Sequence, residues 1–307
     1  MIAALLGIAL TGCQKVSEEF KPFEGSVDGT TMTLTVQVSK AFDTKALSLD
    51  GSTLDASWAE GEKVNVFYGG TCIGTLSVQS VSDSKATLSG EVTGVSGLAV
   101  NSYLTLLFPG RNDKAWTYVG QDGSAPSTSG TMATGYDYAV STLKVSEIDL
   151  SSDPKTISAT VQSAFENQQS IYSFGFRIGD KDGTAVAVKS FTVSSNKNKI
   201  VSERNYVTSD WVSTYGAVTV TPSSASSEPL YMALRNENMT EADTYTFTVV
   251  NSENVLYTGT KVIPVTSNET AVLGYGKFVS AKKVVVNPVA FAPAPTGSVD
   301  GTTVEVL

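Results

Sequence analysis

The sequence predicts an all-β protein with two β-sandwich domains in tandem. Hydrophobic residues make up 41% of the 307 residues and charged residues 17%, enough apolar matter for real cores and too little charge for a disordered chain. Short runs in which apolar and polar residues alternate recur along the chain, separated by Gly, Asp and Asn turns. A strand with one buried face needs this two-residue period. The length suits about two ordinary domains.

The first residues resemble the leader of a bacterial lipoprotein. Residues 1–10 are apolar but too few to span a bilayer, and they end in Leu-Thr-Gly-Cys13, which is similar to a lipobox. On this resemblance, residues 1–13 are a signal peptide, Cys13 carries the lipid (palmitate), and residues 14–24 form a tether to the outer membrane. The alternative is a chance cysteine after an apolar stretch. Lipidation leaves Cys72 without a disulfide partner, and its apolar strand pattern predicts a buried, inert thiol.

Residues 25–150 are predicted to form the N-terminal sandwich. Its first strand covers residues 32–38 and has four apolar side chains on one face: Met32, Leu34, Val36 and Val38. A loop with two basic residues, Lys40 and Lys45, follows. Residues 110–130 are rich in Gly, Ser and Asp and are predicted to be a long surface loop. Further strands are predicted at 64–68, 74–81, 85–92, 102–108 and 131–140.

A polar stretch around residues 148–154 marks the predicted domain boundary, and residues 151–290 form the second sandwich. A short helix is allowed at residues 158–167, and residues 179–183 are a predicted turn between two strands. Three prolines near residue 290 make a stiff linker within the last segment, 291–307. The strands of this domain are predicted at 170–178, 185–193, 199–208, 217–221, 230–234, 245–250, 255–262 and 282–286.

One heptapeptide, GSVDGTT, occurs near each end of the chain, at residues 25–31 and 297–303. In both copies the first and third residues that follow are apolar and the second is polar. The tail residues Val299, Val304 and Val306 therefore correspond to Val27, Met32 and Leu34 of the head. This equivalence predicts that both ends can occupy the same groove. A turn motif reused by chance, or a sequence that stops inside a further domain, would also give two copies.

Composition excludes several function classes. The net charge of −9 disfavours nucleic acid, which needs clustered Lys and Arg. The chain has no histidine, which removes Ser-His-Asp and Cys-His catalysis and all His-ligated metal sites. Acidic pairs such as Glu60 and Glu62 lie in turn-like segments and are interpreted as solvated. We therefore expect no enzyme, no cofactor and no metal.

Several features together resemble the fimbrillin-like lipoproteins of the Bacteroidetes, the type V pilins. These are the lipobox, the basic loop after the first strand, and the segments WAEGEKVNVF (58–67), FGFRI (174–178), VKSFTV (188–193) and YTFTV (245–249). The resemblance implies two transthyretin-like β-sandwich domains, a cell-surface location in a fimbrium, and a role in adhesion. Whether the subunit forms the shaft, the anchor or the tip stays open.

The family resemblance also implies a mechanism of assembly. A trypsin-like protease cuts after a basic residue in the loop behind the first strand, and Lys45, with Lys40 second, matches that position. The family usually has arginine there, and an ordinary solvated lysine is the alternative. The first strand is then displaced, and the C-terminal strand of another copy or a related pilin replaces it.

A function of another class stays open beside the pilin. In this alternative, the chain is a surface lipoprotein that binds glycans or acts as an adhesin without polymerising. Trp116, Tyr118 and Trp211 would then be exposed aromatic platforms on which sugar rings stack.

Overall fold

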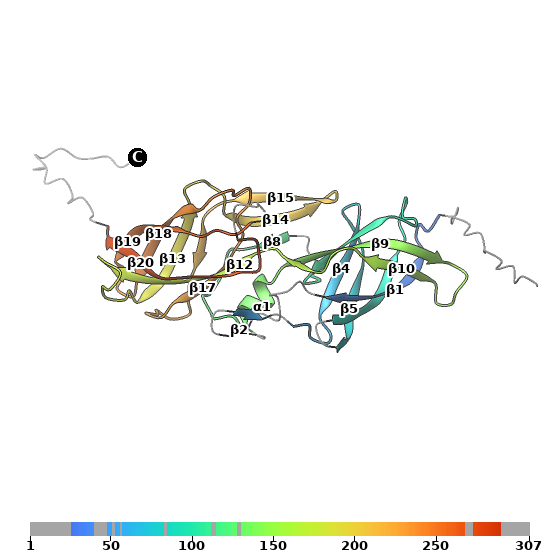
Figure 1. The fold of residues 1–307 in the computed structure, drawn as a ribbon, viewed down its shortest axis with the longest axis horizontal. Helices are drawn as coiled ribbons and strands as arrows, with labels where there is room; N and C mark the ends of the chain where they lie inside the picture. Colours follow the sequence, from blue (N-terminus) through green and yellow to red (C-terminus); the bar gives the residue numbers. More distant parts are fainter. Residues whose placement is uncertain are drawn as a thin grey trace, which may run out of the picture.

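The computed structural model describes residues 26–39, 48–50, 53–55, 57–82, 85–111, 115–127, 130–267 and 273–289. In these ranges the chain is almost entirely β-strand, and the strands form two sandwich-like domains that lie end to end (Figure 1). The predicted all-β fold with tandem domains is confirmed. No helix in the described part of the chain is long and apolar enough to cross a bilayer.

The first domain closes around one hydrophobic core. Its strands follow the order β10–β1–β6–β5–β4–β7–β9–β11, and β10 also pairs with β9, so that seven of the strands form a ring. Alternate side chains of each strand point inward, as the sequence pattern predicted. The strands are β1 (Thr31–Ser39), β4 (Lys63–Tyr68), β5 (Thr71–Ser82), β6 (Lys85–Thr93), β7 (Tyr103–Phe108), β9 (Ala139–Asp149), β10 (Thr156–Val161) and β11 (Glu166–Asn167), with a separate pair β2 (Ser48–Asp50) and β3 (Thr53–Asp55).

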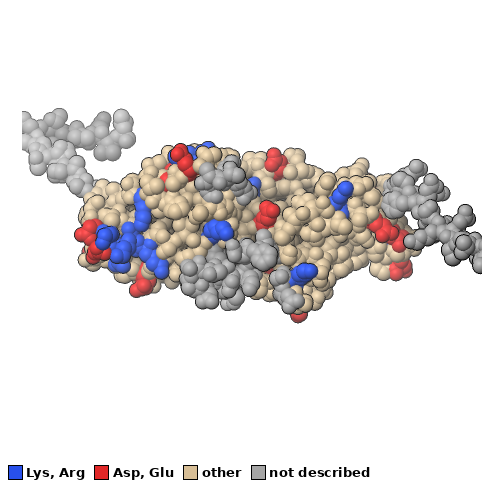
Figure 2. Space-filling view, viewed as in Figure 1, with Lys and Arg blue, Asp and Glu red and all other residues tan. Residues whose placement is uncertain are grey.

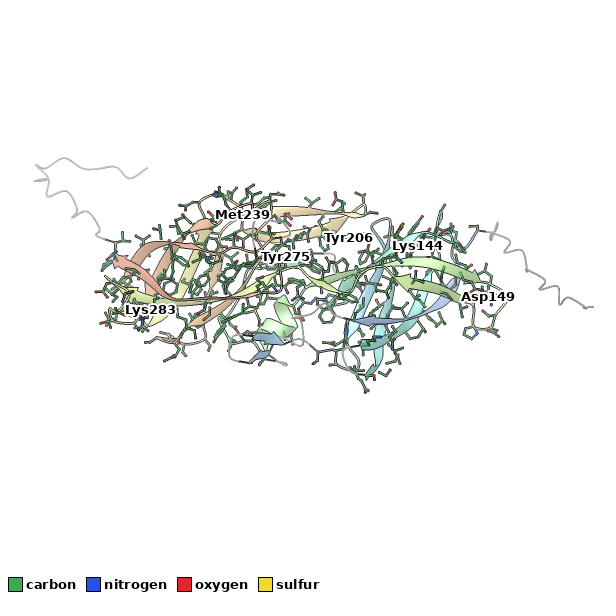
Figure 3. All side chains as sticks on the ribbon, in the orientation of Figure 1. Lys144, Asp149, Tyr206, Met239, Tyr275 and Lys283 are labelled. Carbon is green, nitrogen blue, oxygen red and sulfur yellow. The ribbon has the colours of Figure 1, made fainter. Side chains whose placement is uncertain are left out.

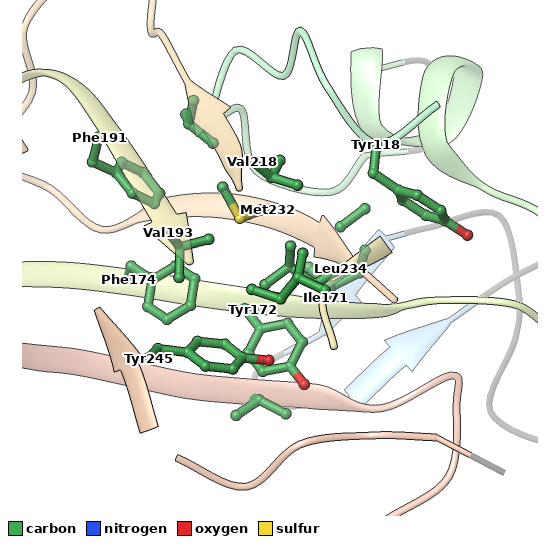
Figure 4. Packing of buried hydrophobic residues seen from close by; sticks show 14 of the residues in the cluster. Tyr118, Ile171, Tyr172, Phe174, Phe191, Val193, Val218, Met232, Leu234 and Tyr245 are labelled. Carbon is green, nitrogen blue, oxygen red and sulfur yellow. The ribbon is translucent and has the colours of Figure 1, made fainter. Parts of the chain in front are cut away.

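The second domain is held together by aromatic side chains. Phe174 and Phe247 meet edge to face with ring centroids 5.1 Å apart, and Tyr172 and Tyr245 lie beside them in the same core (Figure 4). The strand order is β16–β13–β18–β19–β20–β12–β17. These strands are β12 (Ser170–Ile178), β13 (Val188–Ser195), β16 (Val218–Val220), β17 (Leu230–Leu234), β18 (Asp243–Asn251), β19 (Leu256–Ile263) and β20 (Phe278–Pro288).

The outer surface is mostly uncharged. Figure 2 shows charged side chains spread thinly over the visible face, with a group of lysines and arginines at the far end of the second domain. In the second domain, Lys181 and Lys283 both pair with Asp182. Elsewhere the outer face of the sheets carries hydroxyl groups, such as the Thr35–Ser89 pair at 2.7 Å.

The first sheet extends past residue 150, where the sequence placed the domain boundary. β10 pairs with both β1 and β9, and β11 pairs with β9. The cis peptide bond between Asp153 and Pro154 lies in the turn that joins β9 to β10. The polar, proline-containing stretch is therefore a hairpin turn inside the first sheet.

Between residues 131 and 167, two predictions of secondary structure are wrong. Residues 158–167, where a helix was allowed, contain the end of β10 and, after a short bend, β11, because pairing with β9 outweighs local preference. Residues 131–140, predicted as one strand, form helix α1 (Thr131–Tyr136) and then the start of β9. Cys72 is also exposed, not buried as predicted, since the neighbouring Ile73 takes the inward position on β5.

Residues 110–130, predicted as a surface loop, cross into the second domain. Within them, β8 (Ala115–Thr117) pairs with β14 (Val201–Val207). Gln121 is buried, and its side-chain amide exchanges hydrogen bonds of 2.7 and 2.8 Å with the main chain of Ala233 on β17. The prediction was wrong because the Gln121 side chain forms hydrogen bonds to the main chain of β17 such as a neighbouring strand would form. A Gly- and Ser-rich composition does not indicate such contacts.

A hairpin of the second domain contacts the first. It consists of β14 and β15 (Asp210–Tyr215), and its tip, Thr208 and Ser209, has positive φ angles of 46° and 71°. The tip lies against Gly70, where a Cβ atom would be 2.5 Å from the Thr208 nitrogen. Beside it the Tyr206 hydroxyl donates to Thr105 Oγ1 at 3.0 Å. The two domains are thus joined by direct packing as well as by the chain.

Replacing Gly70 with alanine should show how much this contact contributes to stability beyond the cost of a positive φ angle alone. Gly69 and Gly70 both have positive φ, but only Gly70 meets the hairpin, because nothing lies within 4 Å of a Cβ at Gly69. Gly69→Ala is expected to lower the free energy of unfolding by about 1 kcal/mol, and Gly70→Ala by roughly 2–4 kcal/mol because main-chain atoms must also move. Chemical denaturation measures both, and equal losses would contradict the packing role of Gly70.

Candidate functional site

The first strand, β1, lies between two other strands of the sheet. It lies inside the closed sheet, antiparallel to β6 over all nine residues and parallel to β10 over two. Its ends are fixed as well, since Thr33 N donates to Lys155 O at 2.8 Å and Phe165 N donates to Ser39 O at 2.9 Å. Removing β1 would therefore leave two strands with unpaired backbone groups.

The inner face of β1 fills the core of the first domain. Met32, Leu34, Val36 and Val38, the predicted inward set, are 0–5% exposed. Each large apolar side chain contributes roughly 1.5–3 kcal/mol when it is buried. The outward residues of the strand are exposed or half-buried, so β1 is attached by one apolar face and two backbone edges. A strand from another chain with the same alternation of apolar and polar residues could make the same core contacts and backbone hydrogen bonds.

The residues before β1 form a tight turn against the connection that follows β6. Val27 is 2% exposed in the first core, and Thr30 N donates to Val27 O at 2.9 Å across Gly29, whose φ is +73°. Gly29 N donates to Gly94 O at 2.9 Å, and Gly94 N donates to Thr30 O at 2.8 Å. We call residues 26–31 the N-terminal turn. The place that this turn occupies, made of the Gly94 main chain and the core position filled by Val27, is called the Gly94 site.

Other predicted site residues lie outside the described residues. These are the lipidation site Cys13, the cleavage candidates Lys40 and Lys45, and the donor residues Val299, Val304 and Val306. In the sequence, Lys40 follows β1 directly, since β1 ends at Ser39, and Lys45 comes five residues after Lys40. The described chain also ends directly after β20, which runs to the far end of the second domain.

The aromatic platforms expected of a glycan-binding protein are not formed. Trp116 and Tyr118 are 2% and 0% exposed, which corrects the expectation that they lie on the surface. Trp211 is half-buried, with its ring 4.3 Å from that of Trp116 and with the Arg204 guanidinium 4.3 Å from its centroid. These rings pack at the junction of the domains because β8 pairs with β14 there.

A buried ionic cluster lies beside these aromatic rings, and sequence reasoning missed it. Glu237 Oε1 lies 2.6 Å from Arg235 Nε and 3.2 Å from Arg204 Nε, and all three side chains are at most 13% exposed. The guanidinium of Arg235 donates to Gln168 O at 2.7 Å, and that of Arg204 donates to Gln168 Oε1 at 2.8 Å. Gln168 belongs to the segment that joins the two domains, so the cluster fixes that segment.

The charges in this cluster depend on one another. Burial, and then the neighbouring Arg235, lower the pKa of Arg204 to about 10, which leaves it charged at neutral pH. Burial acts to raise the pKa of Glu237, but Arg235, a hydrogen bond with Ser213 and the charge of Arg204 together outweigh it and hold that pKa below its ordinary value. A single carboxylate is therefore shared by two nearby cations.

A small pocket lies beside β7 and α1. A pocket of about 240 Å³ opens between Phe108, Gly110 and Ala133, which is below the usual size of ligand sites. In the described ranges no three acidic or cysteine side chains come together as a metal site would require.

Comparison with known proteins gives distant structural likenesses. The sequence matches no protein-family profile and no curated protein. A candidate cell adhesion protein from Bacteroides uniformis has 10% identity and a TM-score of 0.39, over 84% of this chain and 95% of that one. One from Bacteroides fragilis has 10% identity and a TM-score of 0.36, over 85% and 98%. A fimbrial protein from Bacteroides ovatus has 10% identity and a TM-score of 0.34, over 83% and 49%. At these values no likeness establishes a shared function.

Proposed function

We propose that this protein is a structural pilin of the fimbrillin-like kind, exported as a lipoprotein through Cys13 and assembled at the cell surface by strand exchange. Its partners are further copies of itself or related pilins, together with a trypsin-like protease that cuts after Lys45 or Lys40. The role is structural and not catalytic. The position of β1 carries this proposal, because β1 is the first strand of the described chain and lies between two others, so that it can be exchanged without rebuilding the rest of the domain.

The geometry of the two chain ends supports a filament over a closed pair. The described chain begins at the outer end of the first domain and ends at the outer end of the second (Figure 1). The proposed donor, residues 297–307, follows that second end in the sequence. A contact between unlike ends is heterologous and need not close on itself. Repetition of one such contact extends the assembly along the long axis.

Limited trypsin treatment of residues 14–307 tests the proposal. Cleavage in the Lys40–Lys45 loop should release β1 from its covalent link and produce a ladder of oligomers on a denaturing gel without boiling. The ladder is expected because the returned strand restores both the apolar contacts and the backbone hydrogen bonds.

Two variants serve as controls. Lys40→Ala with Lys45→Ala should stay uncut in this loop and monomeric. A chain without residues 297–307 should be cut and should also stay monomeric. Efficient cleavage of the parent chain with only monomers present would contradict the proposed function.

A further inference from the structure

The N-terminal turn uses nearly every residue of the repeated heptapeptide. Ser26 Oγ accepts from Asp28 N at 3.2 Å, and the Thr30 N to Val27 O bond closes a four-residue turn with Gly29 at its third position. A positive φ of 73° at that position favours glycine. Val27 then points into the core, and Thr31 begins the pairing with Thr93. The heptapeptide is therefore a turn joined to an apolar anchor.

The Gly94 site accepts this turn by backbone contact. Gly94 donates one hydrogen bond to the turn and accepts another, at 2.8 and 2.9 Å. A Cβ atom at residue 94 would lie 2.1 Å from Val27 O, so glycine allows the two main chains to approach this closely. Recognition thus depends on the shape and hydrogen bonds of the turn. Residues 297–303 repeat the amino-acid sequence of this turn in full.

A chain cannot place its second copy in its own Gly94 site. β9 and β20 have eleven residues each and run in opposite directions from the junction, so together they span about 70 Å. Asp149 at the end of β9 and Lys283 near the end of β20 lie at opposite ends of the molecule (Figure 3). Thr33 is level with Asp149, because Thr33 pairs with Thr156 and Thr156 with Asp149. The Gly94 site contacts Thr30, three residues before Thr33 on the same chain. Val299 is eleven residues beyond Pro288, a reach of at most about 40 Å.

We propose that the Gly94 site of one subunit binds the GSVDGTT turn in the tail of another, and that this turn, not the apolar strand alone, selects the tail and sets its register. Val299 takes the position of Val27, which aligns Val304 with the position of Met32 and Val306 with that of Leu34. A strand shifted by one residue would turn its apolar side chains outward. A tail without the heptapeptide lacks the anchor that prevents this shift. The inference rests on the strand exchange proposed above.

Peptide exchange separates the contribution of the turn from that of the strand. The full chain from residue 14 receives a site for a sequence-specific protease between residues 43 and 44 and is cleaved there, so that β1 is held without a covalent link. Fluorescent peptides are then added, and their uptake is followed by anisotropy. One peptide is residues 297–307, one has residues 297–303 in scrambled order, and one carries Val299→Asp. A peptide of residues 25–39 is the positive control.

The 297–307 peptide is expected to bind at least about tenfold more tightly than the scrambled and Val299→Asp peptides, since both lose a buried anchor. Equal binding of all three would overturn the role of the turn and leave strand exchange intact. Uptake of the 25–39 peptide without any uptake of 297–307 would overturn this inference together with the proposed function. Because the variants are in the peptides, folding of the protein does not affect the comparison.

Discussion

Replacing Glu237 with glutamine is expected to lower the free energy of unfolding by about 3 kcal/mol, since removing one partner of a buried ion pair leaves charge without compensation. Glu237 is the carboxylate between Arg204 and Arg235, and its side chain is 13% exposed. Glutamine keeps the shape but removes the charge, so two neighbouring guanidinium groups would stay buried without a counter-ion. Urea denaturation followed by tryptophan fluorescence should report the change, because Trp211 and Trp116 lie beside the cluster.

Glu241→Gln is the matched control. Glu241 also pairs with a cation, Lys197, but its side chain is 74% exposed. The control should therefore change stability by less than about 1 kcal/mol. Similar losses of unfolding free energy in the two variants would contradict the claim that burial makes the Glu237 ion pairs more stabilising than an exposed pair.

The difference in the free energy of unfolding between wild type and Glu237→Gln should also depend on pH. The folded pKa of Glu237 lies below its ordinary value of 4.5, so its charge stabilises the fold above that value. This contribution is expected to decrease as the pH falls below the ordinary pKa and to vanish below the folded pKa. A difference that stays constant through this range would contradict an ionic role.

The predictable parts of this fold are those in which neighbouring residues carry the information. The alternation in residues 32–38 gave β1 and its buried face, and the same pattern gave β18. Alternation is local, since side chains of a strand point to opposite faces whatever the strand pairs with. The hydrophobic pattern therefore predicts which residues are buried better than it predicts the neighbour of each strand.

The junction of the domains could not be predicted because its contacts join distant positions. Gln121 bonds to Ala233, 112 residues away, and nothing near Gln121 indicates burial. Arg204, Arg235 and Glu237 each look like surface charges, and they form a cluster only after β14 and β17 come together. For the same reason, the Gly-rich sequence around Trp116 suggested an exposed ring, although Trp116 is buried in the structure. These features show how two sandwiches predicted separately become one elongated subunit.

Leu34→Ala should have opposite effects on the intact chain and on strand exchange. Leu34 is 0% exposed at the centre of β1, so the substitution is expected to lower the free energy of unfolding by about 2–5 kcal/mol. The C-terminal tail is unchanged by this substitution. After cleavage in the loop behind β1, the resident strand is therefore weakened while its competitor is not.

Cleaved Leu34→Ala is thus expected to form oligomers at least about tenfold faster than the cleaved parent, although its intact form is less stable. Thr35→Ala is the control, because Thr35 is adjacent but exposed, with only its hydroxyl bonded to Ser89 on the outer face. Gel electrophoresis over time measures assembly, and denaturation of the uncut chain measures stability. A general loss of structure would slow assembly or cause precipitation, whereas replacement of β1 by a tail predicts faster growth of ordered ladders. Slower or unchanged assembly of the Leu34 variant would contradict the exchange of this strand.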